Sequence, residues 1–115
     1  MSTPCTVTFG PDGGRIYKHW DGYPEEMLPL FERFFDTVEA ETGDTRFSDA
    51  PYLAAKFVVF LANEYRHENA AQMDFLSVGV IPSEGDFGAD FSYRVECDML
   101  DSKTGRPNIR YSQRY

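Results

Sequence analysis

Residues 90–99 alternate strictly between apolar and polar side chains, and this pattern constrains the fold more than any other feature of the chain. Successive side chains of a β-strand point to opposite faces of a sheet, so the alternation predicts a strand with one buried and one solvated face. The apolar set is Phe91, Tyr93, Val95, Cys97 and Met99. The polar set is Asp90, Ser92, Arg94, Glu96 and Asp98. The chain is therefore expected to form a sheet that is covered on one face only.

Two helices are predicted to supply that cover. The first begins at Pro24, because proline suits the first turn of a helix, and it ends at Gly43, because glycine favours a helix C-terminus. The second follows a cap at Ser48 or Asp49. Residues 52–62 are apolar nearly all round, which predicts a central, well-covered helix rather than a half-exposed one.

Four further strands are predicted from short apolar or alternating runs bounded by turn residues. They cover residues 6–9, 15–20, 74–81 and 108–113. The order along the chain is then ββααβββ. We expect a single α+β domain over residues 1–115, a two-layer sandwich in which an antiparallel sheet of about five strands carries both helices on one face.

The chain of 115 residues is acidic, with 19 Asp and Glu against 11 Lys and Arg and a net charge of -8. Such a domain repels a nucleic-acid backbone, so no direct binding to nucleic acid is expected. The acidic balance has two interpretations. It is a general device for solubility, or it forms a surface that mimics nucleic acid and occupies a basic groove on another protein.

The compartment is predicted from what the sequence lacks. No run of about 18 apolar residues is present, and the N-terminus has no charged-then-apolar pattern, so we expect a cytoplasmic protein without a membrane span. Cys5 and Cys97 lack the spacing and the neighbouring histidines of a zinc site. They are expected to be buried free thiols, with a disulfide as the alternative if their strands are neighbours. No metal or other cofactor is expected.

The first candidate site is the junction between the second strand and the first helix. It contains His19, Trp20, Asp21 and Tyr23, and a histidine near an aspartate and two aromatic rings can bind a ligand or exchange protons. Gly22 interrupts the strand, however, so His19 and Asp21 need not share a face. The simpler interpretation is structural, with Asp21 accepting hydrogen bonds from the turn and the aromatic rings packed.

Part of this junction resembles a known pattern. The string Tyr17-Lys18-His19-Trp20-Asp21-Gly22-Tyr23-Pro24 resembles a Tyr-(Arg/Lys)-His-(Trp/Ser)-Asp-Gly-Tyr-Pro signature of small uncharacterised proteins of bacterial and archaeal viruses and prophages. The similarity continues through residues 27–30 and the alternation at residues 90–95. It implies an origin in a mobile element, and it brings no activity or catalytic residues with it.

The second candidate site is the polar face of the last strands. Arg94, Glu96 and Asp98 alternate along one strand, and Arg110 belongs to the next. Asp90 and Ser92 belong to the same face, which thus carries three carboxylates. Carboxylates two positions apart on a strand are about 7 Å from each other, too far to share one cation without help from another strand, so a solvated face is expected. In the preceding acidic loop, Phe87 is a candidate anchor for a partner.

These features favour a binding protein over an enzyme, because no spacing typical of a catalytic site is present. The leading hypothesis is a viral or prophage protein that acts on a host protein, as an acidic inhibitor of nucleic-acid-binding machinery. Its open sheet face and edge strands are the expected contact surface, and edge pairing predicts a homodimer. The alternative is a protein that binds a nucleotide or other small anion around residues 19–23, with Arg94 or Arg110 as counter-charge.

Overall fold

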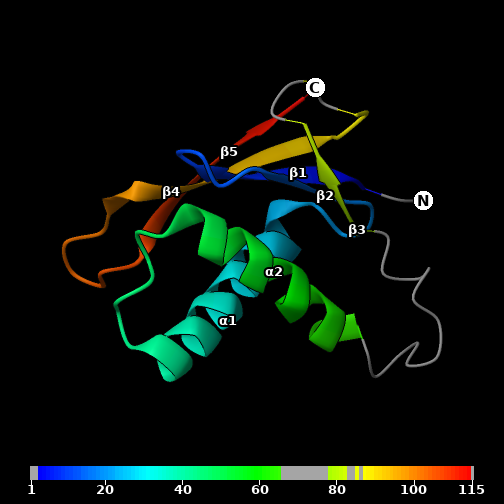
Figure 1. Ribbon diagram of the computed structural model, residues 1–115. Helices are drawn as coiled ribbons and strands as arrows, with labels where there is room; N and C mark the ends of the chain where they lie inside the picture. The colour runs from blue at the N-terminus through cyan, green and yellow to red at the C-terminus, as the bar shows by residue number, and fades with distance from the viewer. Residues whose placement is uncertain (1–2, 66–77, 83–84, 86, 115) are drawn as a thin grey trace.

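The computed structural model describes residues 3–65, 78–82, 85 and 87–114. It has the predicted order of elements. These are β1 (Cys5–Gly10), β2 (Arg15–Lys18), α1 (Pro24–Thr42), α2 (Ala50–Tyr65), β3 (Val78–Ile81), β4 (Phe91–Leu100) and β5 (Pro107–Gln113). Both helices lie on the same side of the sheet, which confirms the α+β class with two layers (Figure 1).

The five strands are arranged in the order β3-β2-β1-β4-β5. All neighbouring pairs are antiparallel except β1 and β4, which run parallel, so the sheet is mixed rather than wholly antiparallel as expected. The physical reason lies in β3, which runs parallel to β1, so the chain must return along the sheet before β4 begins. A segment of nine residues, such as 82–90, can reach about 30 Å and is long enough for this return. The chain therefore enters β4 from the same end at which it entered β1.

The element boundaries agree closely with the turn and cap residues. Helix α1 begins at Pro24, and the N–H of Gly43 closes it on the carbonyl of Glu39 at 2.8 Å. Asp49 accepts a hydrogen bond from the N–H of Tyr52 at 3.3 Å and so caps α2. Strand β2 ends at Lys18, two residues before the predicted end. Of the strand predicted at residues 74–81, the first four residues lie outside the described part of the chain.

The core is a cluster of aromatic rings between the helices and the sheet. Phe57 of α2 lies at its centre, 5.1 Å from the ring of Phe34, 5.6 Å from that of Phe31 and 5.5 Å from that of Phe9. Tyr93 of β4 stacks obliquely on Phe31 from the sheet side. Contacts of this kind add about 0.5–1.5 kcal/mol per pair to the burial of the rings, so they fix the helices on this face.

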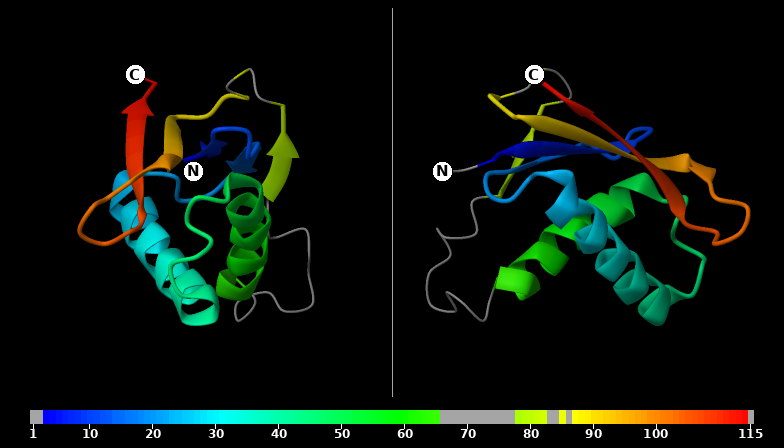
Figure 2. Two further views of the ribbon diagram at one scale, coloured as in Figure 1. Left: turned by 60° about the vertical axis from the view of Figure 1, so that its left-hand side comes forward. Right: turned by 180° about the vertical axis from the view of Figure 1, so that it is seen from behind.

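Helix α2 has one face in solvent, so it is less well covered than the prediction had it. Val59 is 55% exposed, whereas Leu53, Phe57 and Leu61 are buried. A two-layer domain has nothing beyond its helix layer, so even an apolar helix keeps one side in water. Figure 2 shows α1 beneath the β5 side of the sheet and α2 beneath the β3 side. The candidate sites lie on the face away from the helices, along the β5 edge beside α1, and at the junction between β2 and α1.

Candidate functional site

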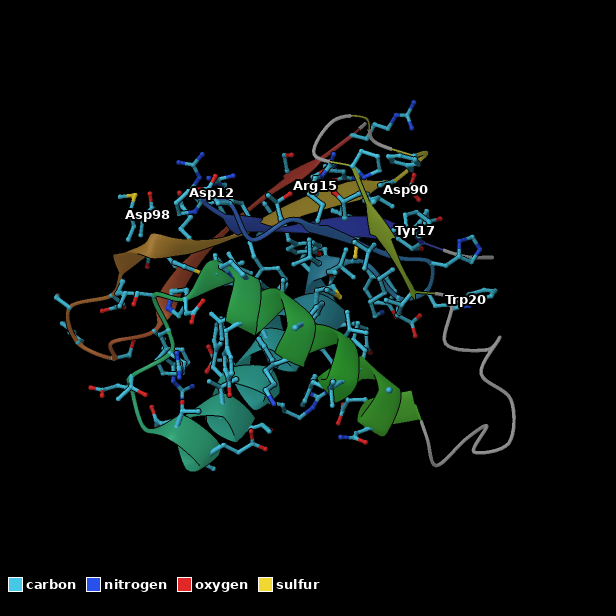
Figure 3. All side chains as sticks on the ribbon, in the orientation of Figure 1. Asp12, Arg15, Tyr17, Trp20, Asp90 and Asp98 are labelled. Carbon is cyan, nitrogen blue, oxygen red and sulfur yellow. The ribbon has the colours of Figure 1, made fainter. Side chains whose placement is uncertain are left out.

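Three arginines lie in one row across the outer face of the sheet, the face away from the helices. Side chains of Cys5, Val7 and Phe9 are buried in the core, so Thr6 and Thr8 point outward. The strand register then places Arg15 opposite Thr8, Thr8 beside Arg94, and Arg94 opposite Arg110. Figure 3 shows Arg15 above the sheet on this face. We call this set the arginine row.

Glu96 lies between the two arginines of β4 and β5. Its carboxylate is 4.0 Å from Nε of Arg94 and 3.7 Å from Nε of Arg110. The Glu96 side chain is only 8% exposed, whereas that of Arg110 is 72% exposed. A Cβ atom on Gly10 would meet the Arg94 guanidinium at 2.2 Å, so the glycine makes room for it. One carboxylate therefore serves the two guanidinium groups of this opposed pair.

Arg15 has a different role from the other two arginines. Its Nη1 donates hydrogen bonds to the carbonyls of Gly85 at 2.6 Å and Pro82 at 3.4 Å. These bonds hold the connection between β3 and β4 against the outer face on the β2 side. Thr6, also on the outer face, is fully buried and donates to the hydroxyl of Ser92. The accessible part of the outer face is consequently its β4–β5 half.

A shallow hollow of about 220 Å³ lies in this accessible half. It is lined by Thr8, Ser92, Tyr93, Arg94, Arg110, Tyr111 and Ser112. Guanidinium and hydroxyl groups donate hydrogen bonds to oxyanions, and charged donors give the strongest of these bonds. The hollow is thus suited to one carboxylate or phosphate group. Ser92 belongs to the predicted polar face, whereas Thr8 and Ser112 were missed in the sequence, although the period of two along their strands places them on that face.

The adjoining strand β5 is an edge of the sheet formed by the described residues. Arg114, just beyond it, donates its N–H to the carbonyl of Asp90 at 2.8 Å. Hydrogen-bonding direction alternates along an antiparallel strand, so the N–H and C=O groups of Ile109, Tyr111 and Gln113 point away from β4. The side chain of Tyr111 is 50% exposed at this edge.

A groove of about 750 Å³ lies between α1 and the first half of β5. Its apolar lining is Leu28, Pro29, Phe31, Phe35, Pro107 and Ile109. Arg106 joins the two walls, with Nη2 2.8 Å from Asp36, and it also contacts Glu32 and Glu39 of α1 at 3.5 Å. The hydrogen bond to Asp36 raises the pKa of Arg106 above its ordinary value. The groove walls are therefore held at a fixed separation.

The junction of residues 19–23 is built by tight backbone contacts. The N–H of Gly22 donates to the carbonyl of Thr3 at 2.7 Å, and the buried Tyr93 hydroxyl donates to the carbonyl of Gly22 at 2.7 Å. A Cβ atom at Gly22 would lie 2.6 Å from the Thr3 carbonyl oxygen. Asp21 has a positive φ of 54° and is exposed. The Asp21-Gly22 pair thus has a structural explanation.

The aromatic residues of the junction do not meet the arginine row. His19 Nδ1 lies 2.8 Å from the Tyr17 hydroxyl, and the His19 and Trp20 rings are edge to face at 4.8 Å. Trp20 is largely exposed, and Tyr23 is the half-buried N-cap residue of α1. Figure 3 places Trp20 at the opposite end of the sheet from Asp98.

Lys18 is the functional candidate at the junction that sequence reasoning missed. It is 2% exposed, and its ammonium donates to the carbonyl of Trp20. Burial lowers its pKa, while the charges of nearby Asp21 and Glu26 act in the opposite direction. It lines a polar hollow of about 220 Å³ together with Asp21, Glu26, Met27, Leu30, Arg33 and Glu64. The period of two in β2 places Lys18 on the core face with Ile16, which is the signal that identifies it.

The remaining predicted residues lie apart from these hollows. Asp98 is exposed near the end of β4, and Phe87 is exposed in the connection before β4, with a positive φ of 51°. Cys5 and Cys97 are buried free thiols, as expected. Although their strands are neighbours, Cys5 is opposite Phe91, six residues from Cys97. Burial raises the pKa of Cys5 to about 12 and that of Cys97 to about 11.

The acidic residues gather on the helix layer rather than on the sheet. Helix α1 carries six exposed carboxylates, at Glu25, Glu26, Glu32, Asp36, Glu39 and Glu41. Within the described residues, no group of three His, Cys, Asp or Glu side chains is arranged to hold a metal ion. The helices of the described part of the chain are also too short or too polar to cross a membrane.

Comparisons with protein-family models, with curated proteins and with solved structures give no match to this chain.

Proposed function

We propose that this chain is a non-enzymatic binding protein that contacts a partner protein through the β5 edge and the accessible half of the outer sheet face. The observation that carries this is the exposed edge itself, where alternate backbone groups of a seven-residue strand point away from the sheet. An extended segment of a partner can add to such an edge, and its main-chain hydrogen bonds then supply affinity.

The charged groups beside the edge suit binding better than catalysis. Arg94 and Arg110 present planar guanidinium groups, which hold anions by charge and by paired hydrogen bonds. Glu96 is held between them and is largely withdrawn from solvent. The site therefore offers recognition by charge and shape rather than a general acid or base.

The origin of the partner is proposed from the resemblance alone. If the chain comes from a virus or prophage, its partner is a host protein in the cytoplasm. An acidic inhibitor of nucleic-acid-binding machinery is proposed to act through α1, because α1 carries six exposed carboxylates. The carboxylate of Glu96 on the sheet lies between two arginines instead. A homodimer through the β5 edges is the other proposed use of this strand.

A second candidate function has one observation in its favour. The polar hollow at the junction contains a buried lysine and three carboxylates, and a hollow of about 220 Å³ accommodates a small polar ligand. We propose that the ligand of this hollow carries both a positive and a negative group, to match Asp21 and Lys18. Arg94 and Arg110 belong to the outer face and do not line it.

The proposed function is tested by affinity capture from cells of the native host with matched variants. Gln113→Pro removes one N–H that points away from β4, whereas Gln113→Ala keeps it. A host protein recovered by the wild type and by the alanine variant, but lost with the proline variant, supports contact through the β5 edge. Recovery that the proline variant leaves unchanged contradicts it.

The same capture separates the α1 surface from the sheet edge. Glu25→Gln combined with Glu41→Gln neutralises two carboxylates that take no part in the ion pairs of Arg106. Loss of the partner in this variant alone would assign the contact to α1. Light scattering of the purified protein decides whether the β5 edge forms a homodimer, since Gln113→Pro would then yield monomers.

A further inference from the structure

We infer that the segment which adds beside β5 is an extended acidic peptide, with carboxylate and apolar side chains in alternation, an inference that rests on the proposed function. The two faces of the β5 edge differ in chemistry. The outer face presents the guanidinium of Arg110, and the helix face opens into the apolar groove beside α1. A strand added at the edge places alternate side chains on these two faces.

On the outer side, an added strand should carry a negative charge. Directly opposed residues of neighbouring strands have Cβ atoms about 5 Å apart, and like charges in such positions repel. Arg94 and Arg110 are opposed in this way, and Glu96 neutralises only one of them. A carboxylate on an added strand, next to Arg110, would balance the second charge of this opposed pair. The planar guanidinium group also matches a carboxylate with two parallel hydrogen bonds.

On the side facing α1, the added strand should carry an apolar residue. Ile109 and Tyr111 point to this side of β5, and the groove beyond Ile109 is lined by Leu28, Pro29 and Phe31 of α1. Leu28 is one of the large apolar side chains left exposed in the described structure. An added strand would cover it with its own apolar side chains, and burial of that surface is favourable.

The same arrangement rejects the opposite register. A peptide shifted by one residue would turn its carboxylates into the groove, whose lining beside Ile109 is Leu28, Pro29 and Phe31. Carboxylates lose hydration against such an apolar lining, and the apolar side chains would then face solvent beside Arg110. The groove and the arginine row therefore specify both the sign of the charge and the alternation.

A second copy of this chain fits the edge less well. Strand β5 itself carries Arg110 on its outer face, so pairing of two β5 strands brings two further arginines toward one row. It offers no carboxylate at residues 107–113 to balance them. The charge complementarity of the edge thus favours an acidic partner over self-association.

The test uses fluorescein-labelled synthetic heptapeptides and the full-length protein. The first peptide alternates glutamate with valine and isoleucine, the second replaces each glutamate by lysine, and the third has the composition of the first in two blocks. We expect the alternating acidic peptide to raise the fluorescence anisotropy on binding, with the other two at least roughly tenfold weaker, as a charged hydrogen bond is worth about that factor. Equal affinity for all three would overturn the inference.

Two variants locate the peptide. Arg110→Glu should invert the charge preference, so that the lysine peptide binds better than the glutamate peptide, and Leu28→Asp should weaken both alternating peptides. Gln113→Ala is the matched control and should bind like the wild type. Absence of binding by any heptapeptide, or an unchanged preference in Arg110→Glu, would contradict the acidic alternation.

Two experimental outcomes distinguish the acidic partner from the use of the β5 edge itself. A host protein that is captured through the β5 edge, in the absence of any preference among the heptapeptides, keeps the proposed function and removes the acidic partner. Capture that is insensitive to Gln113→Pro removes the edge as the contact surface, and the peptide inference falls with it.

Discussion

Arg94 and Arg110 lie directly opposite each other on two antiparallel strands, with the carboxylate of Glu96 3.7–4.0 Å from both. Two like charges at such positions are normally avoided, because the pair costs stability that opposite charges would supply. A binding partner that brings a carboxylate to this pair would offset the cost in the complex. Strained or unfavourable arrangements of this kind concentrate at functional surfaces.

Replacing one of these arginines should separate stability from binding. In Arg110→Gln the repulsion and one long ion pair disappear together, so we expect the free energy of unfolding to stay within about 0.5 kcal/mol of the wild type. Binding of the alternating acidic peptide should weaken by roughly tenfold. Urea denaturation and fluorescence anisotropy measure the two quantities, with Lys103→Gln in the exposed turn after β4 as the control. A marked loss of stability would show that Arg110 is structural.

Glu96 should behave in the opposite way. Glu96→Gln leaves the two arginines opposed without a carboxylate between them and alters a side chain that is only 8% exposed. We expect it to lower the free energy of unfolding by about 1–2 kcal/mol. Adding Arg94→Gln should recover part of this loss, because it removes the repulsion. A double-mutant cycle in urea measures the coupling, and strict additivity would argue against the proposed charge balance.

The close approach of backbone at Gly22 predicts a stability effect. Gly22→Ala would drive a Cβ atom to 2.6 Å from the Thr3 carbonyl oxygen and 2.7 Å from Cβ of Cys5, so backbone must move. We expect a loss of about 2–3 kcal/mol, typical of overpacking. Gly79→Ala is the matched control, since a Cβ atom added there would meet nothing within 4 Å. Thermal unfolding of the two variants compares them directly, and similar melting temperatures would refute the close approach at Gly22.

Stability at alkaline pH should depend on Cys5. Burial raises the pKa of this thiol from 9.0 to about 12, so the unfolded chain loses its proton first. The contribution of Cys5 is fully present below pH 9 and is lost as the pH rises toward 12. Burial of Lys18 changes stability in the opposite direction. Its lowered pKa costs stability while the lysine is charged, and this cost disappears as the pH rises toward its ordinary pKa of 10.5.

Comparison with Cys5→Ala isolates the thiol. Between pH 9 and 11 the wild type should lose stability relative to this variant by at most about 1.4 kcal/mol per pH unit, as one proton is involved. Urea denaturation at each pH measures the difference. Parallel pH profiles for the two proteins would show that Cys5 is not protected from ionisation by the fold.

Much of the candidate site was visible in the sequence as separate pieces. The alternation of residues 90–99 placed Arg94 and Glu96 on the polar face, and Arg110 was assigned to the next strand. The sequence did not show that Arg15 and Thr8 join the same row, because that depends on the register of β1 with both of its neighbours. Nor did it show that Arg106 reaches across to Asp36.

The sequence by itself determined the type and order of the elements. Prolines, glycines and side-chain periodicity act over a few residues, so the start of α1 at Pro24 and its end before Gly43 followed from local chemistry. The same local patterns assigned the buried and solvated faces of β4.

Only the tertiary structure decided how these elements meet. The parallel pairing of β1 with β4 brings residues more than 80 positions apart into register, and no local pattern specifies such a pairing. Tertiary packing also decided three other features: the burial of Lys18, the solvated side of α2 and the groove beside β5. The reason is that local preferences depend on adjacent residues, whereas strand order and burial depend on which long-range packing removes the most apolar surface from water.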